Sequence, residues 1–352
     1  MTGRLSRALP GMLCALALVA LTGAAAAAAP YRLTRSVPLP GDDGWDYLAF
    51  EPQSQRLFIA HGTHVLVVDA ASLQVVGQIA DTPGVHGIAL APELARGYIS
   101  AGRSNLIVEF DLLTLARMRE IKTTGDNPDS ILYEPATERV FTFNGRGRNA
   151  TAVDARSGAV LATIALEAKP EFAVTDAHGH VYVNLEDRNS IAVIDARTLT
   201  VTAVWPIAGC EEPSGLAIDR AGKRLLPVCG NEVMAVVDAR SGKLLGRTPI
   251  GAGVDAAAYD PRARLAFASC GEGAGVLSIV GLRAAGGPTG SESVPTQHGA
   301  RTLALDEPHR RLYLVTADFG VAPAPTPEHP HPRPPQLPGT FRLLVVERAA
   351  VH

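Results

Sequence analysis

Signals of several well-known protein classes are absent from this sequence. It contains only four cysteines and two tryptophans in 352 residues. No Cys-x-x-Cys-His string occurs, so covalently attached c-type haem is excluded. A Gly-x-Ser-x-Gly elbow and a glycine-rich phosphate loop are missing too, so nothing indicates an elbow-type serine hydrolase or a P-loop nucleotidase.

An excess of positive charge is also lacking. Lys and Arg number 32 against 35 Asp and Glu, which gives a net charge of −3. Without the two arginines of the first 29 residues, 30 basic residues remain and the net charge is −5. Nucleic-acid binding is therefore not expected, because it depends on a basic face.

The N-terminal apolar run is too short to cross a membrane as a helix. It covers residues 12–21, follows two arginines and precedes an alanine tract at 24–29. A basic start, a short apolar core and small residues form the pattern of a secretory signal peptide. Residues 1–29 are therefore predicted to be a signal peptide. The mature chain, 30–352, is predicted to be periplasmic or extracellular, without a transmembrane anchor.

What the sequence does contain is an internal repeat of about 42 residues. Each copy starts with a nine-residue segment and continues with further short, β-branched runs bounded by Gly, Pro and Asp. The segments are GWDYLAFEP from Gly44, GVHGIALAP from Gly84, NPDSILYEP from Asn127, KPEFAVTDA from Lys169, EPSGLAIDR from Glu212, GVDAAAYDP from Gly253 and GARTLALDE from Gly299. Four antiparallel strands per repeat of this length are typical of a propeller blade, so the fold class is all-β, a seven-bladed β-propeller.

The two ends of the mature chain predict how the ring closes. YRLTRSVPLPG, from Tyr31, matches the fourth-strand runs of the repeat, and TFRLLVVE, which ends at Glu347, matches the third-strand runs. The N-terminal strand is therefore expected to complete the last blade and to remove an open sheet edge. Only 317–339 departs from the repeat, and its prolines predict an inserted surface loop in an otherwise single domain.

The repeat resembles that of a known family. In VYVNLEDRNSIAVIDARTL, from Val181, and RLFIAHGTHVLVVDAASL, from Arg56, the chain is similar to the YVTN-type (YncE-like) β-propellers. The resemblance covers the whole mature chain, although after Tyr182 the namesake string continues Val-Asn-Leu rather than Val-Thr-Asn. It implies an exported binding or interaction module whose partner is a small-molecule ligand or an envelope protein.

The third position of the nine-residue segment is ionisable in six of the seven copies. The first strand of each propeller blade lines the central channel, so equivalent residues at its start form a ring at one mouth. The third positions are Asp46, His86, Asp129, Glu171, Ser214, Asp255 and Arg301. Because neighbouring carboxylates repel one another unless a proton or cation intervenes, this ring is the predicted ligand-binding site. Its predicted metal ligands are His86, Asp129, Glu171 and Asp255, a donor set compatible with Ca²⁺, Mg²⁺, Zn²⁺ or Mn²⁺.

Three functions fit these features. The leading hypothesis is a module that binds a ligand or protein at the charged mouth. The second is a metal-dependent hydrolase, lactonase-like or esterase-like, in which the ring holds a metal that activates water. The third is a scaffold for an envelope complex that requires the 317–339 loop. A purely structural role stands against all three, since an Asp before a strand often accepts backbone hydrogen bonds and braces the blade.

Three cysteines remain in the mature chain. Cys210 precedes the first strand of the fifth blade and Cys229 ends its second, so antiparallel pairing predicts a disulfide between them. Cys270 occupies the equivalent place in the next blade, where it either pairs with Cys229 instead or stays a free thiol. His61 and His64, at the end of one strand, are assigned to a turn.

Overall fold

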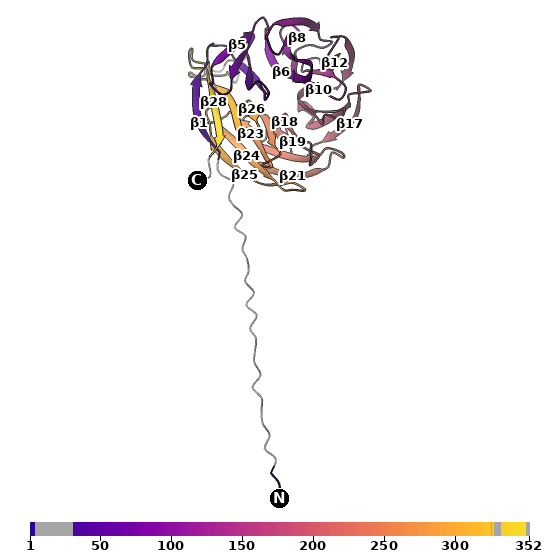
Figure 1. Cartoon of the computed structure of the whole chain (residues 1–352), viewed down its shortest axis with the longest axis vertical. Coiled ribbons are helices and arrows are strands. Elements are labelled where there is room, and N and C mark those ends of the chain that lie inside the picture. Colours follow the sequence, from indigo (N-terminus) through magenta and orange to yellow (C-terminus); the bar gives the residue numbers. More distant parts are fainter. Residues whose placement is uncertain (4–30, 325, 327–331, 350–352) are drawn as a thin grey trace.

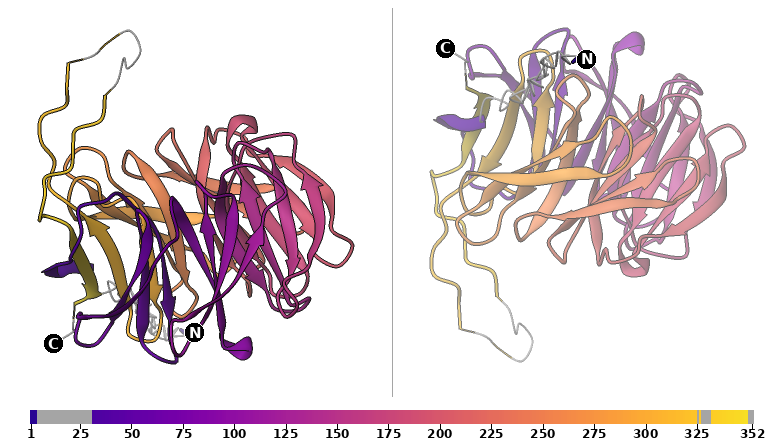
Figure 2. Two further views of the ribbon diagram at one scale, coloured as in Figure 1. Left: turned by 90° about the horizontal axis from the view of Figure 1, so that it is seen from above. Right: turned by 90° about the horizontal axis from the view of Figure 1, so that it is seen from below.

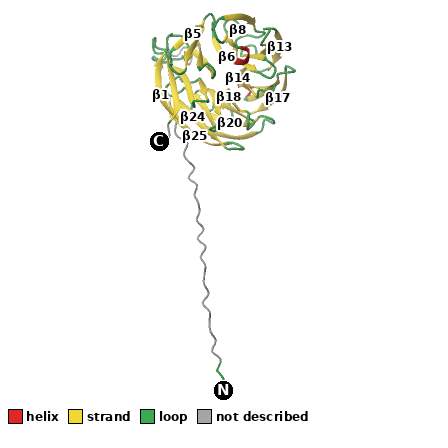
Figure 3. Cartoon of the chain, viewed as in Figure 1, coloured by secondary structure: helices red, strands yellow, loops and turns green. Residues whose placement is uncertain are grey.

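The computed structural model describes residues 1–3, 31–324, 326 and 332–349. In this part of the chain, 28 strands form seven four-stranded antiparallel sheets arranged as a ring (Figures 1 and 3). The predicted fold class is confirmed. The predicted signal peptide falls almost wholly outside the described residues.

The blades follow the repeat in chain order. Blade 1 comprises β2 (Trp45–Glu51), β3 (Arg56–His61), β4 (His64–Asp69) and β5 (Val75–Ile79), and blade 2 comprises β6 (Val85–Ala91), β7 (Arg96–Ala101), β8 (Leu106–Asp111) and β9 (Arg117–Lys122). Blade 3 comprises β10 (Pro128–Glu134), β11 (Arg139–Asn144), β12 (Asn149–Asp154) and β13 (Val160–Ala165), and blade 4 comprises β14 (Pro170–Thr175), β15 (His180–Leu185), β16 (Ser190–Asp195) and β17 (Thr200–Pro206). Blade 5 comprises β18 (Pro213–Asp219), β19 (Arg224–Cys229), β20 (Val233–Asp238) and β21 (Leu244–Pro249), and blade 6 comprises β22 (Val254–Asp260), β23 (Leu265–Cys270), β24 (Val276–Leu282) and β25 (Pro288–Pro295).

Blade 7 combines both ends of the domain. It contains β26 (Leu303–Asp306), β27 (Arg311–Thr316) and β28 (Arg342–Arg348), and its outer strand is β1 (Tyr31–Pro38). Strand β1 pairs antiparallel with β28 from Tyr31 opposite Arg348 to Pro38 opposite Arg342. The expected closure by the N-terminal strand is therefore confirmed.

The hydrophobic core lies between the blades. Seven clusters of buried apolar side chains are present, and each is shared by two neighbouring blades. In the cluster between blades 1 and 7, for example, Trp45 stacks on Phe341, with ring centroids 5.6 Å apart. Since each blade buries one face against each neighbour, its two middle strands are almost continuously apolar and buried.

The turns between third and fourth strands begin at a recurring aspartate. Asp69, at the end of β4, accepts the Ser72 backbone N–H at 2.7 Å, and Leu73 then adopts a φ of 60°. Asp154 repeats this arrangement with Ser157, also at 2.7 Å. These aspartates thus accept backbone N–H groups of the turn, which is a common role of Asp at the start of a turn.

Helical structure is nearly absent from the described residues. It consists of two 3₁₀ turns, η1 (Pro92–Leu94) and η2 (Glu186–Arg188). None of the helices in this part of the chain has the length and apolarity needed to span a membrane.

The 317–339 insertion leaves the disc between β27 and β28. Its two arms extend away from one face of the ring (Figure 2). Near the disc the arms pair through a bridge between Phe319 and Gln336, and Gly320 N–H donates to the Pro335 carbonyl at 2.8 Å. The insertion therefore starts as a short ribbon, despite its prolines.

Candidate functional site

A bulge directs the ring residues into the channel. In blades 1 to 5 the register between the first and second strands shifts across the third and fourth positions of the repeat, as between Trp45 and Leu48. Blade 6 has a shorter shift around Asp255. A bulge turns a side chain away from the regular alternation of a strand. This local irregularity, repeated around the ring, positions the predicted site.

Neighbouring blades fix the backbone of the ring. Ser130 Oγ donates to the Glu171 carbonyl at 2.7 Å, and Asn184 Nδ2 donates to the Ser214 carbonyl at 2.9 Å. The ring closes through Thr302, whose hydroxyl donates to the Asp46 carbonyl at 2.9 Å. Hydrogen bonds between blades thus hold the backbone of the ring.

His86 joins the carboxylates of the two adjacent blades. Its Nδ1 lies 2.6 Å from Asp46 Oδ2 and 3.7 Å from Asp129 Oδ1. Burial alone lowers the pKa of His86, but the hydrogen bond to Asp46 and the charge of Asp129 outweigh burial, so this pKa lies above its ordinary value. The two carboxyl groups therefore favour the protonated form of His86.

Two further ring carboxylates have their own cations. Arg301 Nε lies 2.7 Å from Asp255 Oδ2. Lys169 Nζ lies 2.7 Å from Glu171 Oε1 and also contacts Glu186. Sequence reasoning missed Lys169, although it stands at the first position of the fourth segment, where other blades have Gly, Asn or Glu. The charge repulsion expected in the ring is therefore relieved largely by the protein itself.

The carboxyl groups nevertheless retain protons more strongly than usual. Burial, aided by the charges of Asp46 and Asp255, raises the pKa of Asp129 to about 6. Burial and the charge of Asp129 likewise raise the pKa of Glu171, which is 9% exposed, against the opposing effect of Lys169. Proton uptake by the ring thus falls close to neutral pH.

Two aromatic side chains close the channel below the ring. Tyr47 of blade 1 and Phe172 of blade 4 belong to well-separated blades, yet their ring centroids are 4.9 Å apart. Burial, followed by the charges of Asp255, Asp129, Asp46 and Glu171, raises the pKa of Tyr47 well above its ordinary value. The ring is therefore the bottom of a cup rather than the entrance to an open pore.

The cup has a cavity of about 790 Å³ above one half of the ring. Its lining includes Glu171, Ser214, Asp255 and Arg301 from the ring. The insertion reaches the same cavity, where its lining residues are Phe319, Arg333, Pro334 and Gln336. The inserted loop thus forms part of the wall of the predicted site.

The metal ligands predicted from the sequence are only partly brought together. The ring group with donor atoms within 4.8 Å of one another consists of Asp46, His86 and Asp129. Glu171 and Asp255 instead contact Lys169 and Arg301. The divalent cation stays a prediction.

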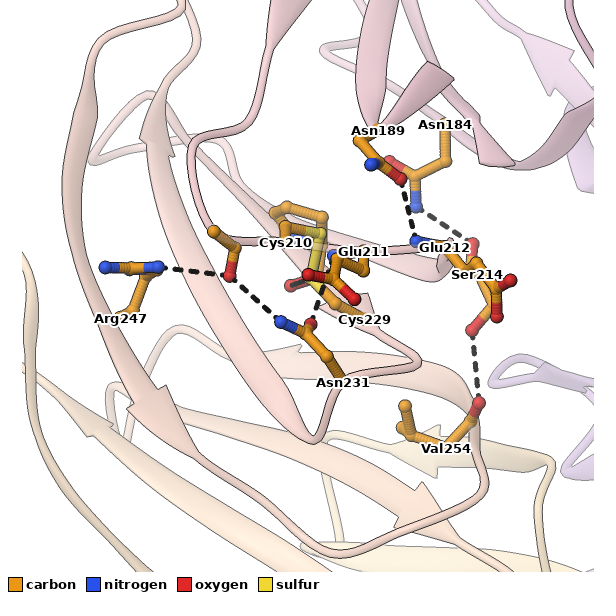
Figure 4. The surroundings of a disulfide bond; sticks show 12 residues. Asn184, Asn189, Cys210, Glu211, Glu212, Ser214, Cys229, Asn231, Arg247 and Val254 are labelled. Atoms are coloured by element: carbon orange, nitrogen blue, oxygen red, sulfur yellow. Dashed lines mark hydrogen bonds between the residues drawn. A yellow bond between two sulfur atoms is a disulfide. The ribbon is translucent and has the colours of Figure 1, made fainter. Parts of the chain in front are cut away.

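The structure contains a disulfide between Cys210 and Cys229, with Cα atoms 5.4 Å apart (Figure 4). It ties the segment before β18 to the end of β19. Cys270 is a buried free cysteine, and burial raises the pKa of its thiol. The blade 6 equivalent of Cys210 is Gly251, where an added Cβ would lie 2.9 Å from the Cys270 Cβ.

Comparisons with known proteins support the fold alone. No family model and no curated protein sequence matches the chain. Among solved structures, hydrazine synthase from Kuenenia stuttgartiensis is similar with a TM-score of 0.66 and 18% identity, over 78% of this chain and 94% of that one. The structure of U3-55K is similar with a TM-score of 0.72 and 10% identity, over 90% and 98%. Since 1790 solved chains match, the fold does not select a function.

Proposed function

We propose that the protein is an exported YVTN-type propeller that binds a small cationic organic ligand in the cup. The observation that carries the proposal is the cavity lining. It contains six carboxyl side chains, Asp42, Glu171, Glu186, Glu212, Asp255 and Glu272, against two guanidinium groups, Arg301 and Arg333. Lys169 adds a third positive charge beside Glu171. Even with Glu171 protonated, five carboxyl groups face three cations, so negative charge is in excess, which favours a positively charged ligand.

Two of these carboxyl groups have neither an ion pair nor a backbone hydrogen bond among the described residues, whereas Asp42, also without an ion pair, accepts the Gly339 N–H. Glu186 and Glu171 contact Lys169, and Asp255 contacts Arg301. In contrast, Glu212 and Glu272 are exposed, and no ion pair is found for their side chains among the described residues. An ammonium group beside either of them would gain a charge partner without displacing an existing cation. A flexible polyamine is the simplest ligand of this kind.

The other two hypotheses receive less support. A metal-dependent hydrolase is expected to leave its metal ligands free of protein cations, whereas Lys169 and Arg301 contact two of the four predicted ligands. A protein partner in the cell envelope would have to share the cup with the insertion, which supplies part of its wall. A small ligand fits a cavity of about 790 Å³ without moving that wall.

Isothermal titration with spermidine tests the proposal. We expect binding that weakens with added salt and falls at least tenfold in the Glu212→Gln/Glu272→Gln variant. A Glu93→Gln/Glu292→Gln variant is the matched control, because it removes the same charge from exposed sites outside the cup lining. No spermidine binding, equal loss in both variants, or tighter binding of succinate than of spermidine would refute a cation-binding cup.

Export is tested separately. The composition of residues 1–29 supports it. Protein recovered from the periplasm or medium is expected to begin near residue 30 by N-terminal sequencing. An intact N-terminus on cytoplasmic protein alone would contradict export and leave the binding test unaffected.

A further inference from the structure

A second cluster of metal-ligating side chains lies in blade 1, outside the ring. His61 ends β3 and His64 begins β4, and the two are directly paired across a two-residue turn, Gly62–Thr63. Asp43 approaches from the segment before β2. The donor atoms of Asp43, His61 and His64 all lie within 4.8 Å of one another.

The backbone is shaped to allow this approach. Gly62 has a φ of +58°, and an added Cβ there would lie 2.4 Å from the Asp43 Cβ. Gly41 has a φ of +102°, and an added Cβ there would lie 2.3 Å from His61 Cε1. Any side chain at either glycine would separate the segment containing Asp43 from the two histidines.

His61 is a buried polar side chain without a partner. Its exposed fraction is 0%, and neither ring nitrogen makes a hydrogen bond of normal geometry. The ring stacks on Phe341 with centroids 4.4 Å apart, so it is held in place beside His64. Buried polar atoms are nearly always paired, so the two ring nitrogens of His61 are candidate ligand atoms.

We propose that Asp43, His61 and His64 form a binding site for a borderline divalent transition-metal ion, with Zn²⁺ as the principal candidate. Two imidazoles and one carboxylate are a donor set of catalytic and transport zinc sites, in which a water takes the fourth position. Ligand atoms around tetrahedral Zn²⁺ are about 3.4 Å apart, so small side-chain rotations suffice to close the cluster. The exposed Asp43 and the half-buried His64 give the ion a route from solvent.

The protonation of the histidines agrees with this assignment. Burial, together with the charge of His64, lowers the pKa of His61 to about 4, against the opposing effect of Asp43. Burial also lowers the pKa of His64. A metal ion needs the neutral imidazole, so the site does not have to expel a proton at neutral pH.

A zinc titration of the full mature chain, freed of metal with EDTA, tests the proposal. Competition with a chromophoric chelator is expected to show one tight site, and Co²⁺ in its place is expected to give visible d–d bands. His64→Gln should weaken binding at least 100-fold and remove those bands. His64 is partly exposed, so this variant is expected to fold even if His61→Gln does not.

Two control variants identify the site. His86→Gln removes the histidine of the ring cluster. His329→Gln/His331→Gln removes the two histidines that the sequence places in the insertion. Tight binding should survive in both. Absence of tight binding in the unmodified chain, its survival in His64→Gln, or its loss in either control would overturn the proposal.

Discussion

Two His–Asp clusters lie close together in this propeller and differ in their protons. Residues of both, Asp43 from one and Asp46 and His86 from the other, line a single cavity of about 370 Å³. In the ring, Asp46 and Asp129 flank His86, whose pKa is raised despite burial. In blade 1, burial lowers the pKa of His61 to about 4. One cluster favours a protonated imidazole, while the other favours a neutral one.

The difference shows that residue composition does not decide what such a cluster does. An imidazole that donates to a carboxylate gains from its positive charge, so it resists replacement of its proton by a metal. For His61, which packs on Phe341, the loss of hydration on burial outweighs the favourable effect of Asp43, so the neutral imidazole is preferred. The arrangement of partners around the nitrogen therefore separates a proton site from a metal site.

The largest change in the free energy of unfolding is expected from His61, under acidic conditions and without metal. The folded state keeps this side chain neutral down to about pH 4, whereas the unfolded chain takes up a proton near pH 6.5. The free energy of unfolding should therefore fall by up to about 3 kcal/mol as the pH drops from 6.5 to 4. His61→Leu removes this term and should flatten the pH dependence.

Urea unfolding in EDTA at several pH values from 7 to 4.5 measures this slope. His178→Gln is the matched control, because it removes an exposed histidine that is not part of either cluster. If the slope of the His61→Leu variant equals that of the unmodified protein, His61 is not held neutral by the fold.

The contribution of His86 to the free energy of unfolding should depend on pH in the opposite sense to that of His61. Its pKa is raised in the folded state, so its contribution to stability is present below the unfolded pKa of about 6.5 and disappears as the pH rises through the folded value. His86→Gln should lower the free energy of unfolding by about 1 to 2 kcal/mol near pH 6, because a charged hydrogen bond is lost. The deficit should shrink toward pH 9. A deficit that stays constant with pH would mean that only packing was lost.

The sequence predicts those features of the fold and of the ring that recur with the repeat. The seven blades, the closure by β1 and the identity of the ring positions all follow from a regular period of about 42 residues. The aromatic pair below the ring, Tyr47 and Phe172, could also have been predicted from the repeat. The fourth positions are small in five blades, Gly87, Ser130, Gly215, Ala256 and Thr302, and aromatic in two, Tyr47 and Phe172.

Side-chain partners were not predictable in the same way. The choice of Lys169 for Glu171, or of both flanking aspartates for His86, depends on how far a bulged strand turns each side chain. Asp43 lies in a connecting segment outside the repeat, so no period places it beside His61 and His64. From the sequence alone, the two histidines were assigned to a turn. Only the structure shows that the ring nitrogens of His61 have no hydrogen-bond partner and can serve as metal ligands.

The smallest expected effect concerns the two aspartates that flank His86. Asp46 lies 2.6 Å from Nδ1 and Asp129 lies 3.7 Å away, so the nearer carboxylate should contribute more to the raised pKa of His86. In NMR titrations, Asp46→Asn is expected to lower that pKa by about one unit and Asp129→Asn by about half a unit. Asp129→Asn should also remove the carboxyl titration near pH 6. The reverse order would mean that His86 donates mainly to Asp129, and that its proton is shared across blades 2 and 3 rather than 1 and 2.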